Sequence, residues 1–344
     1  MTQESTVAPP DEEQPAPSKL LSIGHEKSCA CEANHLNCMD AKSWMKSQIG
    51  VWQFGFEARD IRNKEIHPAT FPISLAKKVI QLFTHEGELV LDPFVGSGTT
   101  LVAAQDTNRN AVGFDLQQKY IEVCRPRIAT VNMFNAAQQL AVLDDARNIP
   151  QYLEPGSVKL IWTSPPYANL LNRKRTNKSR RGDLRQNSQF MKVEQYSQDP
   201  RDLGTMALDD YARTMGDIFE GLLQLLRPKG HCVINVPDMW WENERITIHL
   251  SLIEELRRRG YELRNIIIWD RTNIVNQIGI FGWPNNYITM GVTFEYLLDF
   301  WRPPLGETPL ESKIIGRRLN AASPSGENGE DETDSEDDAG GEPA

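Results

Sequence analysis

The chain has 344 residues, of which 40% are hydrophobic, so it can bury a sizeable core in one large α/β domain or in a domain with an insertion. It contains no run of eighteen apolar residues and no basic-then-apolar leader with a cleavage site, which excludes a transmembrane class and predicts a soluble intracellular protein. The five cysteines are few and odd in number, and they fit a reducing compartment better than a disulfide framework.

The net charge of -10 is concentrated at the two ends of the chain. Residues 1–18 hold four acids and residues 321–344 hold nine, with no Lys or Arg in either segment. Without these thirteen acids, 34 acids remain against 37 Lys and Arg, so the middle of the chain is slightly basic. The composition of residues 1–18 and 306–344 predicts disordered tails. For the acidic C-terminal tail we favour a role in solubility over mimicry of nucleic acid.

Residues 19–65 form a predicted N-terminal extension that contains possible metal ligands. These ligands are His25, Cys29, Cys31, His35 and Cys38. Their spacing is irregular and lacks a second paired knuckle, so the pattern favours free thiols over a zinc site, and we assign no metal ligands. The aromatic-rich stretch Trp44–Phe56 is expected to pack against the main domain or to overhang its ligand site.

A helix is predicted after the motif HPATFP at residues 67–72. Its apolar side chains fall on one helical face, namely Leu75, Val79, Ile80 and Phe83. Two prolines fix the entry to this helix, and its start can receive an anion such as a carboxylate.

The stretch Leu89–Leu101, LVLDPFVGSGTTL, predicts a buried strand, a glycine turn and the start of a helix. Gly96 and Gly98 permit a tight turn with close backbone approach, which suits an adenosine-type ligand at the carboxyl end of the strand. The spacing matches neither the dinucleotide glycine pattern nor a loop that ends in Gly-Lys-Ser/Thr. An ordinary strand-to-helix turn is the alternative.

Two further predicted strands end in an acid. The strand at 111–116 is followed by a helix over Gln117–Ala129, and Asp115 is placed to accept hydrogen bonds from ribose hydroxyls. The strand at 139–145 ends at Asp145, which can accept from an adenine amino group. For both acids the alternative role is to cap the segment that follows.

The stretch Val158–Tyr167 combines a buried strand with two prolines and an aromatic residue. Consecutive prolines cannot continue a strand ladder and fix a rigid turn without N–H donors. A carbonyl and the small hydroxyl of Ser164 can accept from an exocyclic amino group, and Tyr167 offers a ring for stacking a planar base.

Seven basic residues lie within thirteen positions directly after this turn. They are Arg173, Lys174, Arg175, Lys178, Arg180, Arg181 and Arg185. In an acidic chain, this density next to a base pocket favours a loop that contacts phosphates over a merely solvated one. Its lack of apolar periodicity predicts that it orders only on nucleic acid.

The remaining elements continue the alternation of strands and helices. We predict helices at 211–226 and 246–258 and strands at 231–238, 263–269 and 294–301. The segment Asp270–Thr289 either frames the base pocket or reads DNA, or else forms a hairpin insertion. The pattern predicts an α/β fold with a doubly wound sheet.

At these motifs the chain resembles the S-adenosylmethionine-dependent DNA methyltransferases that act on amino groups. DPFVGSGTT matches the cofactor loop of that family, TSPPY its catalytic loop in the N4-cytosine form, and HPATFP the segment beside the methionine end of the cofactor. Adenine-directed members more often carry Asp or Asn at the position of Ser164. The resemblance covers about residues 66–303. Many enzymes with a TSPPY loop place it before the cofactor loop, whereas here it follows.

The resemblance implies a Rossmann-like methyltransferase fold, with a mostly parallel seven-stranded sheet, an antiparallel last strand and an inserted target-recognition region. Its implied parts are a cofactor-binding half at 66–167, a basic DNA-contacting region at 168–207, and a second half at 208–305 that includes an insertion at 270–289. The implied catalytic residues are Ser164, Pro165, Pro166 and Tyr167. The implied cofactor-binding residues are His67, Pro68, Phe71, Asp92, Pro93, Phe94, Gly96, Gly98, Thr99, Asp115, Asp145 and Thr163.

The implied activity is methyl transfer from S-adenosylmethionine to N4 of cytosine in double-stranded DNA, leaving S-adenosylhomocysteine. The resemblance also implies a restriction-modification or epigenetic role and a cognate restriction endonuclease as candidate partner. It further implies a cytoplasmic, nucleoid-associated location in a prokaryote. No membrane partner is expected, and both monomer and dimer stay open. The alternatives are methylation of adenine N6, of RNA or of a small molecule, and a catalytically silent nucleic-acid-binding protein.

Overall fold

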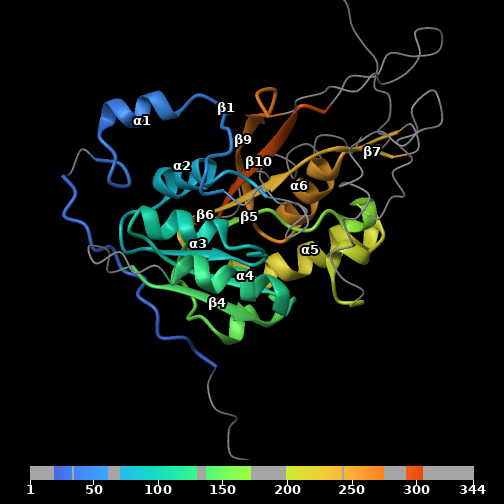
Figure 1. Cartoon of the computed structure of the whole chain (residues 1–344), viewed down its shortest axis with the longest axis horizontal. Helices are drawn as coiled ribbons and strands as arrows, with labels where there is room; N and C mark the ends of the chain where they lie inside the picture. The colour runs from blue at the N-terminus through green and yellow to red at the C-terminus, as the bar shows by residue number, and fades with distance from the viewer. Residues whose placement is uncertain are drawn as a thin grey trace, which may run out of the picture. The chain divides into compact units, whose positions relative to one another are not determined.

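The computed structural model describes residues 19–32, 35–60, 70–129, 137–171, 199–241, 244–274 and 292–304. These ranges form a mixed eight-stranded sheet with helices on both faces (Figure 1). The strands of this sheet, in chain order, are β1 (Val51–Gln53), β2 (Leu89–Asp92), β3 (Asn110–Asp115), β4 (Gln139–Leu143), β5 (Val158–Thr163), β6 (Leu226–Val236), β9 (Glu262–Asp270) and β10 (Phe294–Trp301).

The strand order in space is β1-β9-β10-β6-β5-β2-β3-β4. Every neighbouring pair is parallel except the two pairs that involve β10, which runs against both β6 and β9. The doubly wound, mostly parallel sheet with an antiparallel last strand is therefore confirmed. Parallel strands buried on both faces read as continuous apolar runs, as β2 and β5 do.

The expectation of seven strands is wrong by one, because β1 adds an eighth at the edge of the sheet. Val51 and Trp52 pair in parallel with Ile268 and Trp269 of β9, and the Trp52 side chain is buried. The aromatic-rich stretch therefore packs against the main domain. β1 is only three residues long, too short for its pattern to distinguish a strand in the sequence.

Helices cover both faces of the sheet. α2 (Ile73–Phe83), α3 (Thr99–Asp106) and α4 (Gln118–Ile128) contribute to one buried cluster, and α5 (Leu208–Leu223) and α6 (Ile248–Arg258) to the other. The shorter helices are α1 (Ala41–Ser47), η1 (Ala146–Gln151), η2 (Ala168–Leu171) and η4 (Leu203–Thr205). No helix within the described ranges is both long and apolar enough to cross a membrane.

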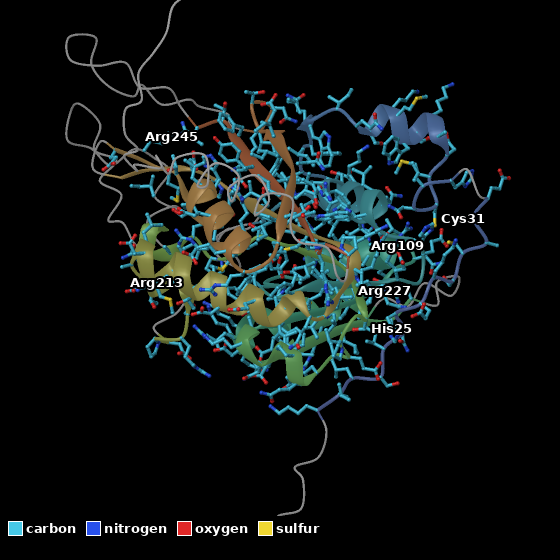
Figure 2. All side chains as sticks on the ribbon, turned by 180° about the vertical axis from the view of Figure 1, so that it is seen from behind. His25, Cys31, Arg109, Arg213, Arg227 and Arg245 are labelled. Carbon is cyan, nitrogen blue, oxygen red and sulfur yellow. The ribbon has the colours of Figure 1, made fainter. Side chains whose placement is uncertain are left out.

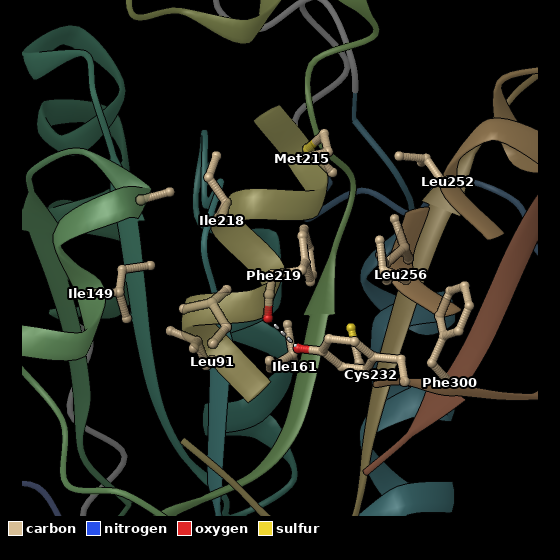
Figure 3. Packing of buried hydrophobic residues seen from close by; sticks show 14 of the residues in the cluster. Leu91, Ile149, Ile161, Met215, Ile218, Phe219, Cys232, Leu252, Leu256 and Phe300 are labelled. Carbon is tan, nitrogen blue, oxygen red and sulfur yellow. Dashed lines mark hydrogen bonds between the residues drawn. The ribbon is translucent and has the colours of Figure 1, made fainter. Parts of the chain in front are cut away.

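The helix periodicity read from the sequence matches the faces that are buried. On α2, Leu75, Val79 and Ile80 are fully buried against the sheet. On the opposite face, Phe219 of α5 packs with residues of β2, β5 and α6 (Figure 3), and its carbonyl accepts a 2.8 Å hydrogen bond from the Tyr261 hydroxyl. This bond fixes α5 to the start of β9.

Two element boundaries differ from the prediction. α5 ends at Leu223, and β6 begins at Leu226, so Arg227–Gly230 belongs to the strand rather than ending the helix. The strand continues there because Lys229 N donates to Arg302 O and Arg302 N donates to Gly230 O, both at 2.9 Å. Ile246, the first residue of the predicted helix 246–258, instead ends β8 (Glu244–Ile246), which forms a small hairpin with β7 (Met239–Trp241), and α6 begins at Ile248.

Several predictions fall outside the described residues. These are the two tails, residues 61–69 of the HPATFP region, the basic segment and residues 275–291 of the predicted insertion.

The strand order reverses between β2 and β5. From β2 the chain winds outward through β3 and β4, and then it returns to β5 on the other side of β2. In open α/β sheets the crevice at such a reversal, at the carboxyl ends of the strands, is where ligands bind. The turns that follow β2 and β5 are therefore adjacent.

Gly98, the N-cap residue directly before α3, allows a test of the turn that follows β2. Its φ is +84°, and a Cβ at this position would lie 2.4 Å from Sγ of the buried Cys124. We predict that Gly98→Ala lowers the free energy of unfolding by about 2–5 kcal/mol, from left-handed strain plus overpacking. Urea unfolding measures this loss.

Gly156→Ala is the matched control, because Gly156 has a φ of +73° and no atom within 4 Å of the added Cβ. It carries the backbone strain alone and should cost about 1–2 kcal/mol. Equal losses for the two variants would show that contact with Cys124 does not constrain the turn.

Candidate active site

A pocket, open to solvent on one side and with about 620 Å³ of space including that open part, lies at the carboxyl ends of β2, β3, β4 and β5. Residues that directly follow these four strands contribute to its wall, and segment 201–203 and α5 close it from outside. The lining residues are Pro93, Phe94, Asp115, Leu116, Gln117, Tyr120, Asp145, Ala146, Arg147, Ser164, Pro165, Pro166, Arg201, Asp202, Leu203 and Ile218. The pocket therefore lies at the reversal of strand order.

The Asp92 carboxylate fixes the turn between β2 and α3. One oxygen accepts from Thr163 Oγ1 at 2.6 Å and from Phe94 N at 3.1 Å, and the other accepts from Thr100 Oγ1 at 2.5 Å. Burial raises the pKa of Asp92 to about 6, against these three hydrogen bonds, which lower it. Asp92 does not line the pocket, and its contacts hold β2, β5 and α3 together around it.

Asp115, at the end of β3, is half-buried and lines the pocket. Its carboxylate accepts from Gly96 N at 3.0 Å and from Gln117 N at 2.8 Å. Burial raises its pKa to about 7. The two amides leave lone pairs free on a carboxylate that faces the pocket, so Asp115 can serve both the turn and a ligand hydroxyl.

Asp145 has the capping role that the sequence offered as an alternative. Its side chain accepts from Arg147 N at 3.0 Å at the start of η1, and it also forms an ion pair of 2.8 Å with the Arg147 guanidinium. It lines the pocket as well. Contact with an adenine amino group stays a prediction.

The structure brings Ser164, Pro165 and Pro166 into the lining of the same pocket as Asp115. Tyr167, by contrast, is 6% exposed, and its hydroxyl lies 2.6 Å from Ser164 Oγ. Burial raises the Tyr167 pKa well above its ordinary value, so the hydroxyl stays protonated. Ser164 therefore stands between the pocket and a neutral, buried tyrosine.

A polar chain behind Ser164 was missed by sequence reasoning. Asn235 Nδ2 on β6 lies 3.4 Å from Ser164 Oγ and donates to Glu295 Oε2 at 2.6 Å, and Glu295 pairs with Arg271. The sequence feature that could have indicated this chain is Asn235, a polar residue inside the otherwise apolar predicted strand HCVINVPD. These contacts orient Ser164 from the side away from the pocket.

The outer wall of the pocket was also missed. Gln117 Nε2 donates to Asp202 Oδ2 at 3.2 Å, so the segment after β3 is tied to the segment before α5. The two residues are 85 positions apart, and no pattern in the sequence connects them. Both residues line the pocket, so this contact joins two segments of its wall.

The remaining predicted cofactor-binding residues lie in the turn after β2, at the end of β5, outside the pocket lining, or outside the described residues. Gly96, Gly98 and Thr99 form the turn and the start of α3, and Thr163 ends β5. Phe71 lies against Trp162 with ring centroids 5.1 Å apart, outside the pocket lining. His67, Pro68 and all seven predicted DNA-contacting residues lie outside the described ranges.

The start of α2, predicted to receive an anion, contacts a carboxylate of the same chain. Asp60 is 8% exposed, and it accepts from Ile73 N at 2.8 Å and from Glu57 N. The helix N-terminus favours this negative charge. An external carboxylate at the same amide would have to displace Asp60.

Comparison with known proteins gives a family match over residues 21–126, to the family model described as DNA methylase. The chain is 35% identical over 99 residues to the type II methyltransferase M.BglI of Bacillus subtilis, and the match covers 29% of the chain and 27% of that protein. It is 49% identical over 93 residues to M.HindIII of Haemophilus influenzae, covering 24% of the chain and 30% of that protein. The matched part thus spans less than a third of either relative.

Among solved structures, TrmN of Thermus thermophilus matches with a TM-score of 0.42 and 18% identity, covering 70% of this chain and 52% of that one.

The lining residues suit the cofactor of this family. Asp115 offers acceptors for ribose hydroxyls, and Phe94, Leu116 and Ala146 offer apolar surface for a planar base. With the strand order and the glycine turn, these matches support a relationship of residues 21–126 to the S-adenosylmethionine-dependent DNA methyltransferases that act on amino groups, without distinguishing N4-cytosine from N6-adenine members.

Proposed function

We propose that this protein methylates N4 of cytosine at specific sites in double-stranded DNA, in a restriction-modification or epigenetic role. The observation that carries the proposal is one pocket, with Asp115 on one wall and Ser164-Pro165-Pro166 on another. A cofactor held at Asp115 and a base held at Ser164 would meet within it. The Ser at position 164, where adenine-directed members more often carry an acid or Asn, favours cytosine.

Bound S-adenosylmethionine would supply an electrophilic methyl group on its sulfonium sulfur. The chain's own contribution is placement of the target nitrogen. Ser164 Oγ and the Pro165 carbonyl accept from the exocyclic amino group, which raises electron density on the nitrogen and aligns it for in-line attack. Because Pro165 and Pro166 have no N–H, the turn presents acceptors without a competing donor.

The target base must leave the duplex to reach this pocket, at a cost of a few kcal/mol. We assign the contacts with the DNA backbone to the seven basic residues between Arg173 and Arg185, which follow the pocket loop in sequence. Stacking of the flipped base on Tyr167 requires its ring, now 6% exposed, to open towards the pocket. Pro166 offers an apolar surface already at the wall.

The direct test is incubation of the purified chain with labelled S-adenosylmethionine and, in parallel reactions, mixed-sequence duplex DNA or RNA, followed by nucleoside mass analysis. We expect N4-methylcytosine. N6-methyladenine would overturn the assignment of the target base. Transfer of the label to RNA but not to DNA would overturn the assignment of DNA as the substrate. Cofactor binding with no labelled product from either would favour a silent binder.

Ser164→Ala should lower kcat for DNA methylation by about 10- to 100-fold, because it removes a hydrogen bond to a group that becomes charged in the transition state. The dissociation constant for the cofactor should change little. Ser157→Ala is the control, since Ser157 is a buried serine beside the opposite end of β5 that bonds to Glu154 O. Unchanged turnover in Ser164→Ala would remove Ser164 from the mechanism.

Asp115→Ala should weaken cofactor binding by about 10- to 100-fold, since a charged acceptor for the ribose is lost. Asp144→Ala is the control, because Asp144 also follows β4 at this edge but bonds to Tyr152 and Asn148 outside the pocket lining. Calorimetric titration with S-adenosylmethionine measures both. An unaltered dissociation constant in Asp115→Ala would reduce Asp115 to a support of the turn.

The raised pKa of Asp115 adds a pH dependence. Its pKa of about 7 means that the carboxylate is ionised above this pH and neutral below it, so cofactor affinity should fall as the pH drops through 7. Asp115→Asn should bind weakly with little change between about pH 8 and about pH 6. The same slope in Asp115→Asn as in the wild-type protein would assign the titration to another group.

A further inference from the structure

Three cysteines of the N-terminal extension and one histidine that is distant in sequence converge near the amino end of β2, away from the pocket. These residues are Cys29, Cys31, Cys38 and His85, and their ligand atoms all lie within 4.8 Å of one another. His85 belongs to the connection between α2 and β2, 47 residues after Cys38. Figure 2 labels Cys31 on this flank of the molecule, near Arg109.

The distances from the histidine nitrogen to the three sulfurs match the edges of a tetrahedral metal site. Nδ1 of His85 lies 3.4 Å from Sγ of Cys29, 3.6 Å from Sγ of Cys31 and 3.5 Å from Sγ of Cys38. Zinc bonds of about 2.3 Å to sulfur and about 2.1 Å to nitrogen, at tetrahedral angles, separate such atoms by about 3.6 Å. One imidazole nitrogen is therefore nearly equidistant from three thiols at the spacing that zinc imposes.

A disulfide does not account for the cluster. The sulfurs of Cys29 and Cys31 are 3.1 Å apart, whereas a disulfide bond is about 2.05 Å long. All three cysteines are free thiols and only partly buried. A third thiol and a histidine at the same point are the donor set of a structural zinc site of the Cys₃His type.

The backbone around Cys38 is shaped to present its sulfur. Leu36 and Met39 pair across a two-residue turn in which Asn37 has φ +51° and Cys38 has φ +69°. Left-handed φ is uncommon for cysteine and persists where the surroundings hold it. Glu86 N donates to Cys38 Sγ at 3.3 Å, a contact that orients the sulfur and suits a thiolate.

The surroundings also offset the charge of such a site, because three thiolates and one Zn²⁺ carry a net charge of -1. Arg109 is 3% exposed, and its guanidinium donates to Thr84 O at 2.8 Å and to Asn37 O at 3.4 Å. These acceptors are next to His85 and Cys38. A buried cation therefore lies against both halves of the cluster.

From these observations we infer that Cys29, Cys31, Cys38 and His85 bind one structural Zn²⁺ ion. The site lies at the amino end of β2, whereas the pocket lies at its carboxyl end, and four protein ligands leave no open position for substrate. Its function is to hold the N-terminal extension against the turn before β2. The inference does not depend on the proposed methylation, and it reverses the preference for free thiols drawn from spacing alone.

The first test measures bound metal in the full chain. After expression with added Zn²⁺ and dialysis against metal-free buffer, mass spectrometry should find one zinc per chain. Cys38→Ser and His85→Gln should lose it, whereas Cys124→Ser and Cys232→Ser should retain it, because these two thiols are fully buried elsewhere in the core. A wild-type chain without zinc, or zinc retained in both cluster variants, would overturn the inference.

A second test needs no variant and so does not depend on whether the variants fold. Iodoacetamide, with peptide mapping, should leave Cys29, Cys31 and Cys38 unmodified in the zinc-loaded protein and label them after a chelator is added. Cys124 and Cys232 should stay unmodified in both states, which shows that the core remains folded. Equal labelling of the three cluster thiols with and without chelator would contradict the assignment.

Discussion

The buried Asp92 carboxylate is the constraint on which the active-site architecture depends. It accepts hydrogen bonds from the turn after β2, from the first turn of α3 and from the last residue of β5. A buried carboxylate is stable only with such partners, and losing one of them costs about 1–3 kcal/mol. Because Thr163 is both a partner of Asp92 and the residue before Ser164, the Asp92 side chain fixes both the glycine turn after β2 and the start of the Ser-Pro-Pro turn after β5.

Ser164 is also held in place by side chains outside the pocket lining. Asn235, Glu295 and Arg271 form a polar chain across β6, β10 and the end of β9, and Asn235 reaches Ser164. Because β10 runs antiparallel to β6, its first residues, which include Glu295, lie beside the last residues of β6. The strand that departs from the parallel pattern thus carries a residue that helps to orient Ser164 through Asn235.

Local sequence predicted the parts of the site that lie within one strand and its turn. Leu89–Asp92 with Gly96 and Gly98, the acid at 115 and the Ser-Pro-Pro turn could be read directly, because apolar runs, prolines and glycines act over a few residues. Contacts between distant segments could not be read in this way. Asp60 at the start of α2, Gln117 with Asp202, and β1 beside β9 depend on tertiary packing, and a three-residue edge strand carries too short a pattern.

The N-terminal extension shows why spacing is a poor guide to a shared site. Its cysteines looked irregular because the fourth ligand, His85, belongs to the main domain, and α1, β1 and α2 separate it from them in the chain. The extension is anchored at further points along this edge: Ser28 N donates to Glu86 O at 2.8 Å, and Arg227 donates to the His25 carbonyl and to Glu26 Oε1. Hydrogen bonds alone leave such a segment free to separate step by step. A metal ion that joins three residues of the extension to one residue before β2 makes its attachment cooperative, because each ligand lost weakens the hold on the others.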